Sequence, residues 1–354
     1  MKSVPLANVA QLAEFDEIID ARSPGEFAQD HIPGALNFPV LEDAERARVG
    51  MIYKQVSAFD AKKIGAALVS RNIARHIEDC FVAKPRGWKP LIYCWRGGSR
   101  SGALAHVLKQ IGFDTARLDG GYKAYRRAVV AELDSLPSRF DFRVVCGPTG
   151  SGKSRLLQAL LESGAQVLDL EGLAVHRGSV LGNLPDAQQP PQKMFDSQLW
   201  WTLKHFDPIQ PVYVEAESKK IGLLRVPDAL LARMHEGGCV RVEVATPLRV
   251  VLLKEEYAHF LANPADLKEK LDCLVGLYGH QIIARWNALA EQGAWDELVL
   301  ALLEGHYDPA YGKSTLKNYP QYTGTTPIVV ENISPAGFLS VAQRILEQGL
   351  DGLD

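Results

Sequence analysis

The sequence has few cysteines, no long hydrophobic run and no large excess of charge of either sign. Its five cysteines include no Cys-x-x-Cys pair, which excludes a zinc knuckle and a dithiol redox centre, so no metal-ligating residues are expected. No stretch approaches the roughly 18 uninterrupted apolar residues of a membrane span. The N-terminal segment also lacks the apolar run of a signal peptide. These absences predict a cytoplasmic protein without a membrane partner.

Charge is unevenly distributed along the 354 residues, whose net charge is −3. Residues 1–135 contain 19 Lys and Arg against 16 Asp and Glu, a net charge of +3, whereas the remainder contains 20 against 26, a net charge of −6. This balance excludes a protein whose whole surface is basic and coats nucleic acid, but it permits a local basic patch.

The length and the order of patterns predict two α/β domains. In the first, residues 1–135, apolar runs alternate with helical stretches, which favours a mostly parallel sheet. Strands are expected at 18–20, 91–93 and 115–118, and a helix at 101–111. A joint at 133–139 leads to the second domain, residues 136–354, with a strand at 143–146, a helix at 155–162 and a helical C-terminal part. Residues 182–193 contain three prolines and are expected to form an irregular loop of this domain.

Residues 93–101, YCWRGGSRS, place a cysteine at the start of a loop rich in glycine and arginine. The backbone N–H groups of a strand–loop–helix can stabilise an anion, and Gly97 and Gly98 let the backbone curl. Because the thiolate is the reactive form of cysteine, nearby positive charge favours reactivity. We therefore identify Cys94, Arg96 and Arg100 as candidate catalytic residues. Two chemistries use such a loop: sulfur-group transfer through a persulfide, and phosphate-ester hydrolysis through a phosphocysteine.

The residues around this loop resemble a known domain. Residues 20–27, DARSPGEF, and 31–37, HIPGALN, resemble the N-terminal signature of rhodanese domains, and GGY at 120–122 resembles their closing turn. Asp20 and His31 fall in the scaffold part of that signature. The spacing from Cys94 to Arg100 is one residue longer than in the commonest sulfurtransferase loop and matches the related phosphatases, although Tyr93 stands where those usually carry histidine. The wider loop is compatible with selenium attached to phosphate.

Residues 147–154, GPTGSGKS, follow an apolar strand, precede a helix and match the Walker A motif in full. Backbone N–H groups would hold a diphosphate, Lys153 would neutralise it, and Ser154 would face a Mg²⁺ ion if one takes part. The expected phosphate-binding residues are Gly147, Thr149, Gly150, Ser151, Gly152, Lys153 and Ser154.

Polar residues after two later apolar stretches are candidates for accessory roles. Residues 211–218, PVYVEAES, contain Glu215 and Glu217, as in a Walker B element with Glu in place of Asp, or as acids that merely cap a strand. His176 and Arg177 follow a strand expected at 167–171 and are a candidate acid or base and a candidate phosphate partner, or are structural. No Asn-Lys-x-Asp motif for guanine is present, so the loop can hold a diphosphate other than a nucleotide.

Three aromatic residues near the middle of the chain, Phe195, Trp200 and Trp201, have helical spacing. Core packing is the favoured interpretation of such spacing. An apolar pocket, suited to a terpene chain or to a stacked base, is the alternative.

The joint presence and the order of the two loops resemble the bacterial tRNA 2-selenouridine synthases. Residues 169–171, 176–179, 215–218 and 306–309 are also similar to that family. The resemblance implies a rhodanese-like domain, a P-loop domain and a tRNA with 2-thiouridine at the wobble position as partner. It implies that a geranyl group moves from geranyl diphosphate to the sulfur, and that selenium from selenophosphate then displaces the S-geranyl group.

The resemblance also implies that Cys94 and Lys153 are essential and that no cofactor is tightly bound. Cys94 would serve the selenium step, either by carrying selenium covalently or by assisting its transfer. Lys153 and the Walker loop would grip the diphosphate of geranyl diphosphate without ATP hydrolysis. Two other functions stay open: an ATP-dependent tRNA sulfurtransferase, and an NTP-regulated rhodanese or phosphatase-like protein that does not act on tRNA.

Overall fold

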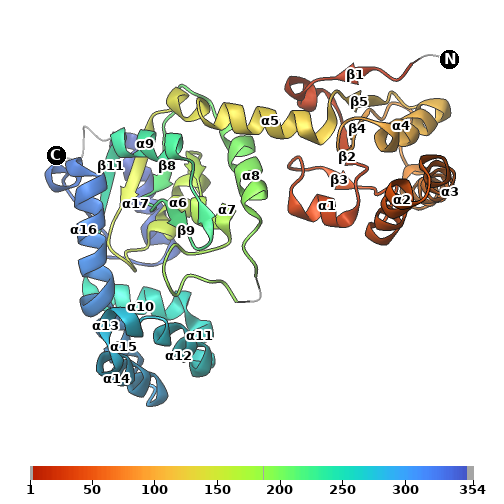
Figure 1. The fold of residues 1–354 in the computed structure, drawn as a ribbon. Coiled ribbons are helices and arrows are strands. Elements are labelled where there is room, and N and C mark those ends of the chain that lie inside the picture. The colour runs from red at the N-terminus through yellow and green to blue at the C-terminus, as the bar shows by residue number, and fades with distance from the viewer. Residues whose placement is uncertain (1–2, 186, 349–354) are drawn as a thin grey trace. The chain divides into compact units, whose positions relative to one another are not determined.

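The computed structural model describes residues 3–185 and 187–348, which divide into two compact units. Unit 1 consists of Met1–Glu132 and Pro190–Trp201, and unit 2 of Leu133–Gln189 and Thr202–Asp354. Residues 190–201, which the sequence pattern placed in the second domain, thus lie in unit 1. Each unit contains its own parallel sheet and helices (Figure 1), and the predicted α/β class is confirmed.

Unit 1 contains a five-stranded parallel sheet in the order β1-β5-β4-β2-β3. Its strands are β1 Leu6–Ala7, β2 Glu17–Asp20, β3 Leu36–Asn37, β4 Pro90–Tyr93 and β5 Ala116–Leu118. β4 is central and all four of its residues are buried, as is typical of a parallel strand covered on both faces. The strands expected at 18–20, 91–93 and 115–118 are therefore confirmed as β2, β4 and β5.

The helices of unit 1 follow its strands, except for one inserted pair. The first set is α1 Pro24–Gln29, α4 Ser99–Ile111 and α5 Gly121–Leu133, with the short helices η1 Val9–Glu14 and η2 Ile77–Phe81. α2 Asp43–Gln55 and α3 Ala58–His76 pack against each other as a hairpin between β3 and β4. Ser57 starts α3, because its hydroxyl accepts the N–H groups of Phe59 and Asp60. The sequence analysis did not predict this hairpin.

The helix α8 Gln192–Lys204 supplies the segment of unit 1 that comes from the middle of the chain. Phe195 and Trp200 are buried. The indole of Trp200 packs edge-on against Tyr125 of α5, with 5.6 Å between ring centroids, and its Nε1 donates to Glu132 at 3.0 Å. These contacts favour the core-packing interpretation of the aromatic residues in this helix.

Unit 2 contains a second five-stranded parallel sheet, in the order β12-β11-β6-β8-β7. Its strands are β6 Phe142–Cys146, β7 Gln166–Leu168, β8 Val212–Glu215, β11 Gly238–Glu243 and β12 Ile328–Val329. Separately from this sheet, β9 Lys220–Ile221 pairs with β10 Leu224–Arg225 as an antiparallel hairpin. β6, expected at 143–146, is confirmed as the central strand. The strand expected at 167–171 ends early, because Asp169 caps a helix by accepting the N–H of Gly172 at 2.7 Å.

The core of unit 2 lies between this sheet and the helices α6 Lys153–Glu162 and α17 Pro335–Gln348, which pack against each other. Three further short helices are η3 Leu136–Arg139, α7 Leu170–Ala174 and α9 Asp228–Glu236. No helix in the described part of the chain has the length and hydropathy needed to cross a membrane.

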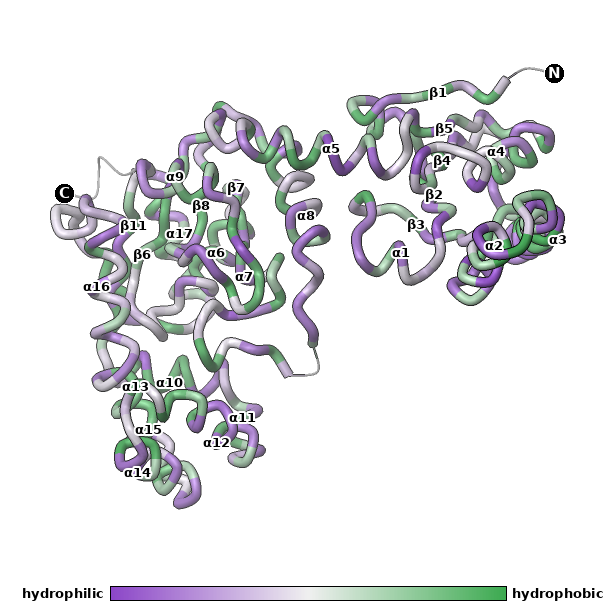
Figure 2. Tube along the Cα trace, viewed as in Figure 1, coloured by the Kyte–Doolittle hydropathy of each residue, from purple (hydrophilic) through white to green (hydrophobic). Residues whose placement is uncertain are grey.

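A helical subdomain occupies the chain between β11 and β12. It consists of α10 Thr246–Glu256, α11 Ala258–Ala262, α12 Pro264–Asp272, α13 Val275–Tyr278, α14 His280–Glu291, α15 Trp295–Leu302, η4 Leu303–Tyr307, α16 Asp308–Asn318 and η5 Pro320–Gly324. Hydrophobic stretches of α10 and α15 (green in Figure 2) contribute to its core, which includes Leu253, Leu298 and Leu302.

Candidate active site

Cys94 lies at the carboxyl end of β4, directly before a loop that leads into α4. Its side chain is buried, whereas Trp95 and Arg96 of the loop are exposed. The Sγ of Cys94 is 3.2 Å from the hydroxyl oxygen of Ser101, in the first turn of α4. A hydroxyl at this position can donate a hydrogen bond to a thiolate, which stabilises the reactive form. Ser101 is a candidate residue that the sequence analysis did not name, although it ends the stretch that carries Cys94.

The Cys94 loop is closed by the turn that begins α5. The carbonyl oxygen of Cys94 accepts the N–H of Tyr122 at 2.8 Å, and that of Trp95 accepts the N–H of Lys123 at 3.1 Å. Gly121 has a φ of +58°, and a Cβ there would lie 2.3 Å from the carbonyl oxygen of Cys94. Only glycine fits both the conformation and the space. The GGY stretch therefore holds the Cys94 loop in a fixed position through these backbone hydrogen bonds.

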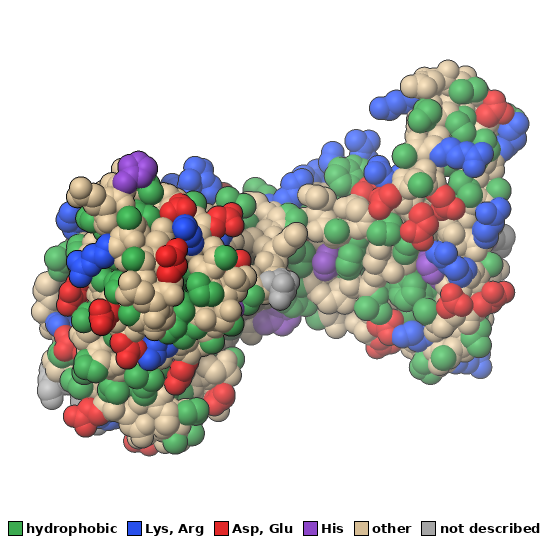
Figure 3. Space-filling view, turned by 90° about the horizontal axis from the view of Figure 1, so that it is seen from below, with side chains coloured by type: hydrophobic (Ala, Val, Ile, Leu, Met, Phe, Trp, Pro, Cys, Tyr) green, Lys and Arg blue, Asp and Glu red, His purple; other side chains and the backbone are tan. Residues whose placement is uncertain are grey.

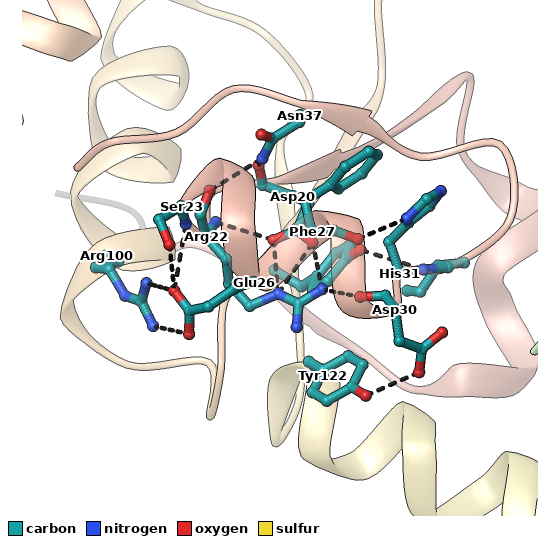
Figure 4. A network of polar contacts seen from close by, with 12 residues as sticks. Asp20, Arg22, Ser23, Glu26, Phe27, Asp30, His31, Asn37, Arg100 and Tyr122 are labelled. Atoms are coloured by element: carbon teal, nitrogen blue, oxygen red, sulfur yellow. Dashed lines mark hydrogen bonds and ion pairs between the residues drawn. The ribbon is translucent and has the colours of Figure 1, made fainter. Parts of the chain in front are cut away.

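A buried polar network includes Tyr122, whose N–H closes this loop (Figure 4). The guanidinium of Arg22 binds the carboxylate of Asp20 with an Nη2–Oδ2 distance of 2.6 Å, and donates to the carbonyl oxygen of Asp30. It also lies 4.0 Å from the ring centre of Tyr122, whose hydroxyl donates to Asp30 at 2.8 Å. Burial opposes the charge of Arg22, but hydrogen bonds and attraction to Asp20 raise its pKa above the usual value. The network joins the start of α5 to β2, which gives the sequence signature its scaffold role.

The two arginines of the Cys94 loop lie in different environments. Arg100 forms a two-pronged ion pair with Glu26, with distances of 2.5 Å and 3.2 Å. Burial works against the charge of Glu26, but the hydrogen bond and charge of Arg100 lower the pKa of this carboxyl below its usual value. No ion pair or side-chain hydrogen bond of Arg96 occurs among the described residues. An anion bound at the loop would therefore meet Arg96 directly and would compete with Glu26 for Arg100.

The Walker loop occupies the equivalent place in unit 2, between β6 and α6. The Nζ of Lys153 donates to the carbonyl oxygens of Gly147 at 2.8 Å and Pro148 at 3.3 Å. Gly152 has a φ of +74°, and a Cβ there would lie 2.3 Å from the ring of Phe338. The backbone thus turns sharply at Gly152, with N–H groups gathered at the start of α6, as an anion-binding loop requires.

Residues far away in the sequence hold the Walker loop in place. Arg249 of α10 is buried, donates to the carbonyl oxygen of Thr149 at 2.9 Å and forms a two-pronged ion pair with Asp308. The hydroxyl of Tyr311 accepts the N–H of Gly147 at 2.5 Å. Asp308 falls in the similar stretch 306–309, but nothing in the sequence pattern pointed to Arg249 or Tyr311. The helical subdomain therefore positions the loop.

Four acidic residues gather at the carboxyl ends of β7 and β8, beside the Walker loop. The hydroxyl of Ser154 donates to Glu171 at 3.1 Å, and the N–H of Glu171 donates to Glu215 at 2.7 Å. Burial, with repulsion from Glu171 and Asp169, raises the pKa of Glu215 well above its usual value. Burial and the nearby Glu171 raise the pKa of Glu217 to about 8. At neutral pH part of this cluster is therefore protonated.

His176 and Arg177 lie in a turn next to the same cluster. His176 is buried; its Nδ1 accepts the N–H of Gly178 at 3.1 Å, and burial lowers its pKa below the usual value. A neutral imidazole whose Nδ1 is already hydrogen-bonded holds the turn together. The guanidinium of Arg177 donates to the carbonyl oxygen of Glu256 and lies 4.9 Å from the ring centre of Tyr257. Arg177 also lines the cavity described next, so it can reach an anion there.

A cavity of about 960 Å³ opens beside the Walker loop. Its lining includes the polar residues Lys153, Ser154, Glu171 and Glu217 and also the apolar and aromatic residues Leu253, Tyr257, Tyr307, Tyr311, Tyr319 and Phe338. Phe195, Trp200 and Trp201 are not among its lining residues. The alternative interpretation of these three residues as a terpene pocket is therefore not supported at this cavity, whose aromatic residues come from the helical subdomain and α17.

Both regions match known family models. Residues 6–128 match the rhodanese-like domain, and residues 140–279 match the tRNA 2-selenouridine synthase AAA domain. No group of three or more His, Cys, Asp or Glu side chains among the described residues is arranged to hold a metal ion.

Curated relatives named tRNA 2-selenouridine synthase cover most of the chain. The protein from Nitrosomonas europaea is 36% identical over 72% of this chain, and that from Marinobacter nauticus 37% over 68%. These alignments span 66% and 65% of the relatives, slightly less than two thirds of their length. The relative from Alcanivorax borkumensis is 33% identical over 83% of this chain and 88% of its own length. This chain, with its Cys94 loop and its Walker loop, therefore belongs to the tRNA 2-selenouridine synthase family.

Proposed function

We propose that the protein converts 2-thiouridine at the wobble position of tRNA into 2-selenouridine in the cytoplasm, by geranylation of the sulfur and its replacement by selenium. The main observation in support is the pairing of two anion loops in one chain, one with a buried thiol and the other beside an aromatic cavity of about 960 Å³. A thiol beside an anion loop suits the handling of selenophosphate. A lysine-bearing loop beside an apolar wall suits geranyl diphosphate.

In the first step, the thiocarbonyl sulfur attacks C1 of geranyl diphosphate. The C1–O bond breaks, diphosphate leaves, and the N3 proton of the uridine is released. Lys153 and the N–H groups of the Walker loop stabilise the charge that develops on the departing diphosphate. Leu253, Tyr257, Tyr307 and Phe338 line the same cavity and provide an apolar surface for the terpene chain.

Mg²⁺ would fit beside this loop. Ser154 and Glu171 provide adjacent oxygen atoms, and Oε2 of the buried Glu215 has no hydrogen-bond partner among the described residues. Mg²⁺ is commonly bound by one or two carboxylates together with phosphate oxygens. Ser154 and Glu171 would hold the ion, which would neutralise charge on the diphosphate.

In the second step, selenium replaces the S-geranyl group. Selenide attacks C2 of the geranylated base, the C2–S bond breaks, and geranyl thiol leaves with one proton. Selenium in selenophosphate is already at the selenide level, so a Cys94–selenium bond would need an oxidant and later a reductant. We infer instead that the thiolate of Cys94 attacks phosphorus and releases selenide. Water then hydrolyses the phosphocysteine to phosphate and thiol, so atoms and electrons balance without a redox partner.

A reconstituted reaction tests the proposal. Thiolated tRNA, geranyl diphosphate and the protein should give the geranylated nucleoside without ATP, and added selenophosphate should give selenouridine, both measured by mass spectrometry of nucleosides. A product that forms only with ATP would contradict the proposal that the Walker loop uses geranyl diphosphate without ATP hydrolysis. Geranyl diphosphate should also bind the wild type and not a K153A/S154A double variant; unchanged binding would contradict the role of the Walker loop.

A further inference from the structure

A second cavity, of about 890 Å³, lies beside the Cys94 loop and is formed within unit 1. It is lined by residues of the α2–α3 hairpin, among them Val49, Ala66 and Val69, and by Trp95, Ser99 and Ala103 of the Cys94 loop and α4. We call it the hairpin groove. It is therefore continuous with the loop that carries the candidate nucleophile.

The hairpin exposes an unusual amount of apolar surface to solvent. Met51, Tyr53, Val56 and Phe59, at its turn, are 57%, 59%, 74% and 69% exposed. Clustered apolar side chains on a surface indicate a binding site more often than isolated ones do.

The rim of the hairpin groove is cationic. Arg46, Lys54, Lys62 and Arg100 line it, against a single acid, Glu26, whose carboxylate is already bound by Arg100 and lies 3.7 Å from Arg46. Figure 3 shows Lys and Arg side chains on one face of unit 1, together with hydrophobic side chains and several Asp and Glu side chains. An apolar floor with a cationic rim is complementary to a hydrophobic chain attached to a polyanion.

We propose that the hairpin groove binds the S-geranyl chain of the modified uridine during the selenium step, while its rim contacts the flanking phosphates of the tRNA. This proposal rests on the proposed function, because only the geranylated intermediate joins a ten-carbon apolar chain to a nucleic acid. The position of the groove beside the Cys94 loop brings C2 of the base near the site where selenide is released. The groove thus selects the intermediate over the thiolated starting tRNA.

Two neighbouring alanines of α3 provide a matched test. Ala66 and Ala67 are both exposed, but only Ala66 lines the groove. Fluorescence anisotropy compares the binding of an anticodon stem-loop RNA with S-geranyl-2-thiouridine and of the same RNA with 2-thiouridine. The wild type should bind the geranylated RNA at least about tenfold more tightly, since burial of several CH₂ groups provides this preference. A66W should lose the preference and A67W should keep it.

The binding assay needs no catalysis, so its result is separate from that of the proposed function. The groove proposal would be overturned if the wild type bound the two RNAs equally, or if A66W kept the preference for the geranylated RNA. A protein partner would then be the remaining candidate for binding in the groove. A preference in the wild type that A66W abolishes would support the groove even if no selenouridine formed. K62E should weaken the binding of both RNAs to the same extent, and by more than K63E does, because Lys63 does not line the groove. If K62E and K63E weakened binding equally, a role of the rim in phosphate binding would be contradicted.

Discussion

The Cys94 loop and the Walker loop have the same architecture in two different domains. Each follows the central strand of a five-stranded parallel sheet, and each depends on a glycine with positive φ, Gly121 in one and Gly152 in the other. The first loop begins with a buried thiol and the second ends with a lysine at the start of its helix. We infer that the backbone of each loop binds an anion, and that the side chain it carries, a thiol in one and a lysine in the other, determines whether the loop forms bonds or only stabilises charge.

The cations of the two loops also differ in their partners. Lys153 donates to carbonyl oxygens of its own loop, whereas Arg100 is paired with the carboxylate of Glu26. A phosphate bound at the Walker loop would replace neutral carbonyl oxygens as the acceptors of Lys153. A phosphate bound at the Cys94 loop would have to compete with the charged carboxylate of Glu26 for Arg100. We therefore infer tighter anion binding at the Walker loop.

The largest expected effect separates the loops by their chemistry. C94A should lower selenouridine formation from geranylated tRNA by about 10³-fold or more, because the nucleophile is lost, and should leave geranylation unchanged. Nucleoside mass spectrometry measures both products. C80A, which changes an exposed cysteine of the same unit, is the control. Loss of geranylation in a folded C94A protein would show that the loops do not divide the reaction in this way.

The second expected effect concerns the Walker lysine. K153A should slow geranylation by about 10²–10³-fold, as is typical when one charge-stabilising donor is lost. Pre-geranylated tRNA should restore selenouridine formation by this variant to the wild-type rate. K313A, at an exposed lysine of α16 outside the cavity, should behave as wild type. A K153A protein that fails on pre-geranylated tRNA would mean that both loops serve the selenium step.

The smallest expected effect is on stability and concerns the acidic cluster beside the Walker loop. Glu217 has a pKa of about 8 in the folded protein against an ordinary value of 4.5. Below pH 4.5 both states are protonated, and between pH 4.5 and 8 only the unfolded state ionises, so stability falls as pH rises. The slope for one proton is at most about 1.4 kcal/mol per pH unit. Urea denaturation at several pH values measures how the free energy of unfolding depends on pH. This dependence should be flatter in E217Q than in the wild type and unchanged in E304Q. A steeper dependence in E217Q would contradict the prediction.

Local patterns in the sequence predicted the two loops because most of their components lie within about ten residues; the exception is Gly121, which belongs to the separate GGY stretch. The strand, the glycines and the charged residue of each loop are adjacent in the chain, and their backbone geometry follows from local rules. The same holds for Asp20 and Arg22, whose buried ion pair spans two residues. Local order was therefore enough to predict the α/β class, the position of Cys94 at a strand end and that of Lys153 at the start of a helix.

The partners of these residues could not be predicted in this way. Arg249 and Asp308 are 59 residues apart, and Glu26 and Arg100 are 74 apart, so their pairing depends on tertiary packing. Asp169 was expected within a strand at 167–171, but its side chain caps α7 instead. The aromatic spacing of α8 indicated burial without indicating in which unit.

The segment 190–201 has a consequence for how the two modules can be separated. A gene fragment that ends at residue 135 would encode unit 1 without Phe195 and Trp200, and would expose the face of α5 that carries the buried Tyr125. Joining this fragment end to end with another domain would likewise separate it from residues 190–201, which contribute to its hydrophobic core. The rhodanese-like module of this chain thus depends on a later segment of the same polypeptide to complete its hydrophobic core.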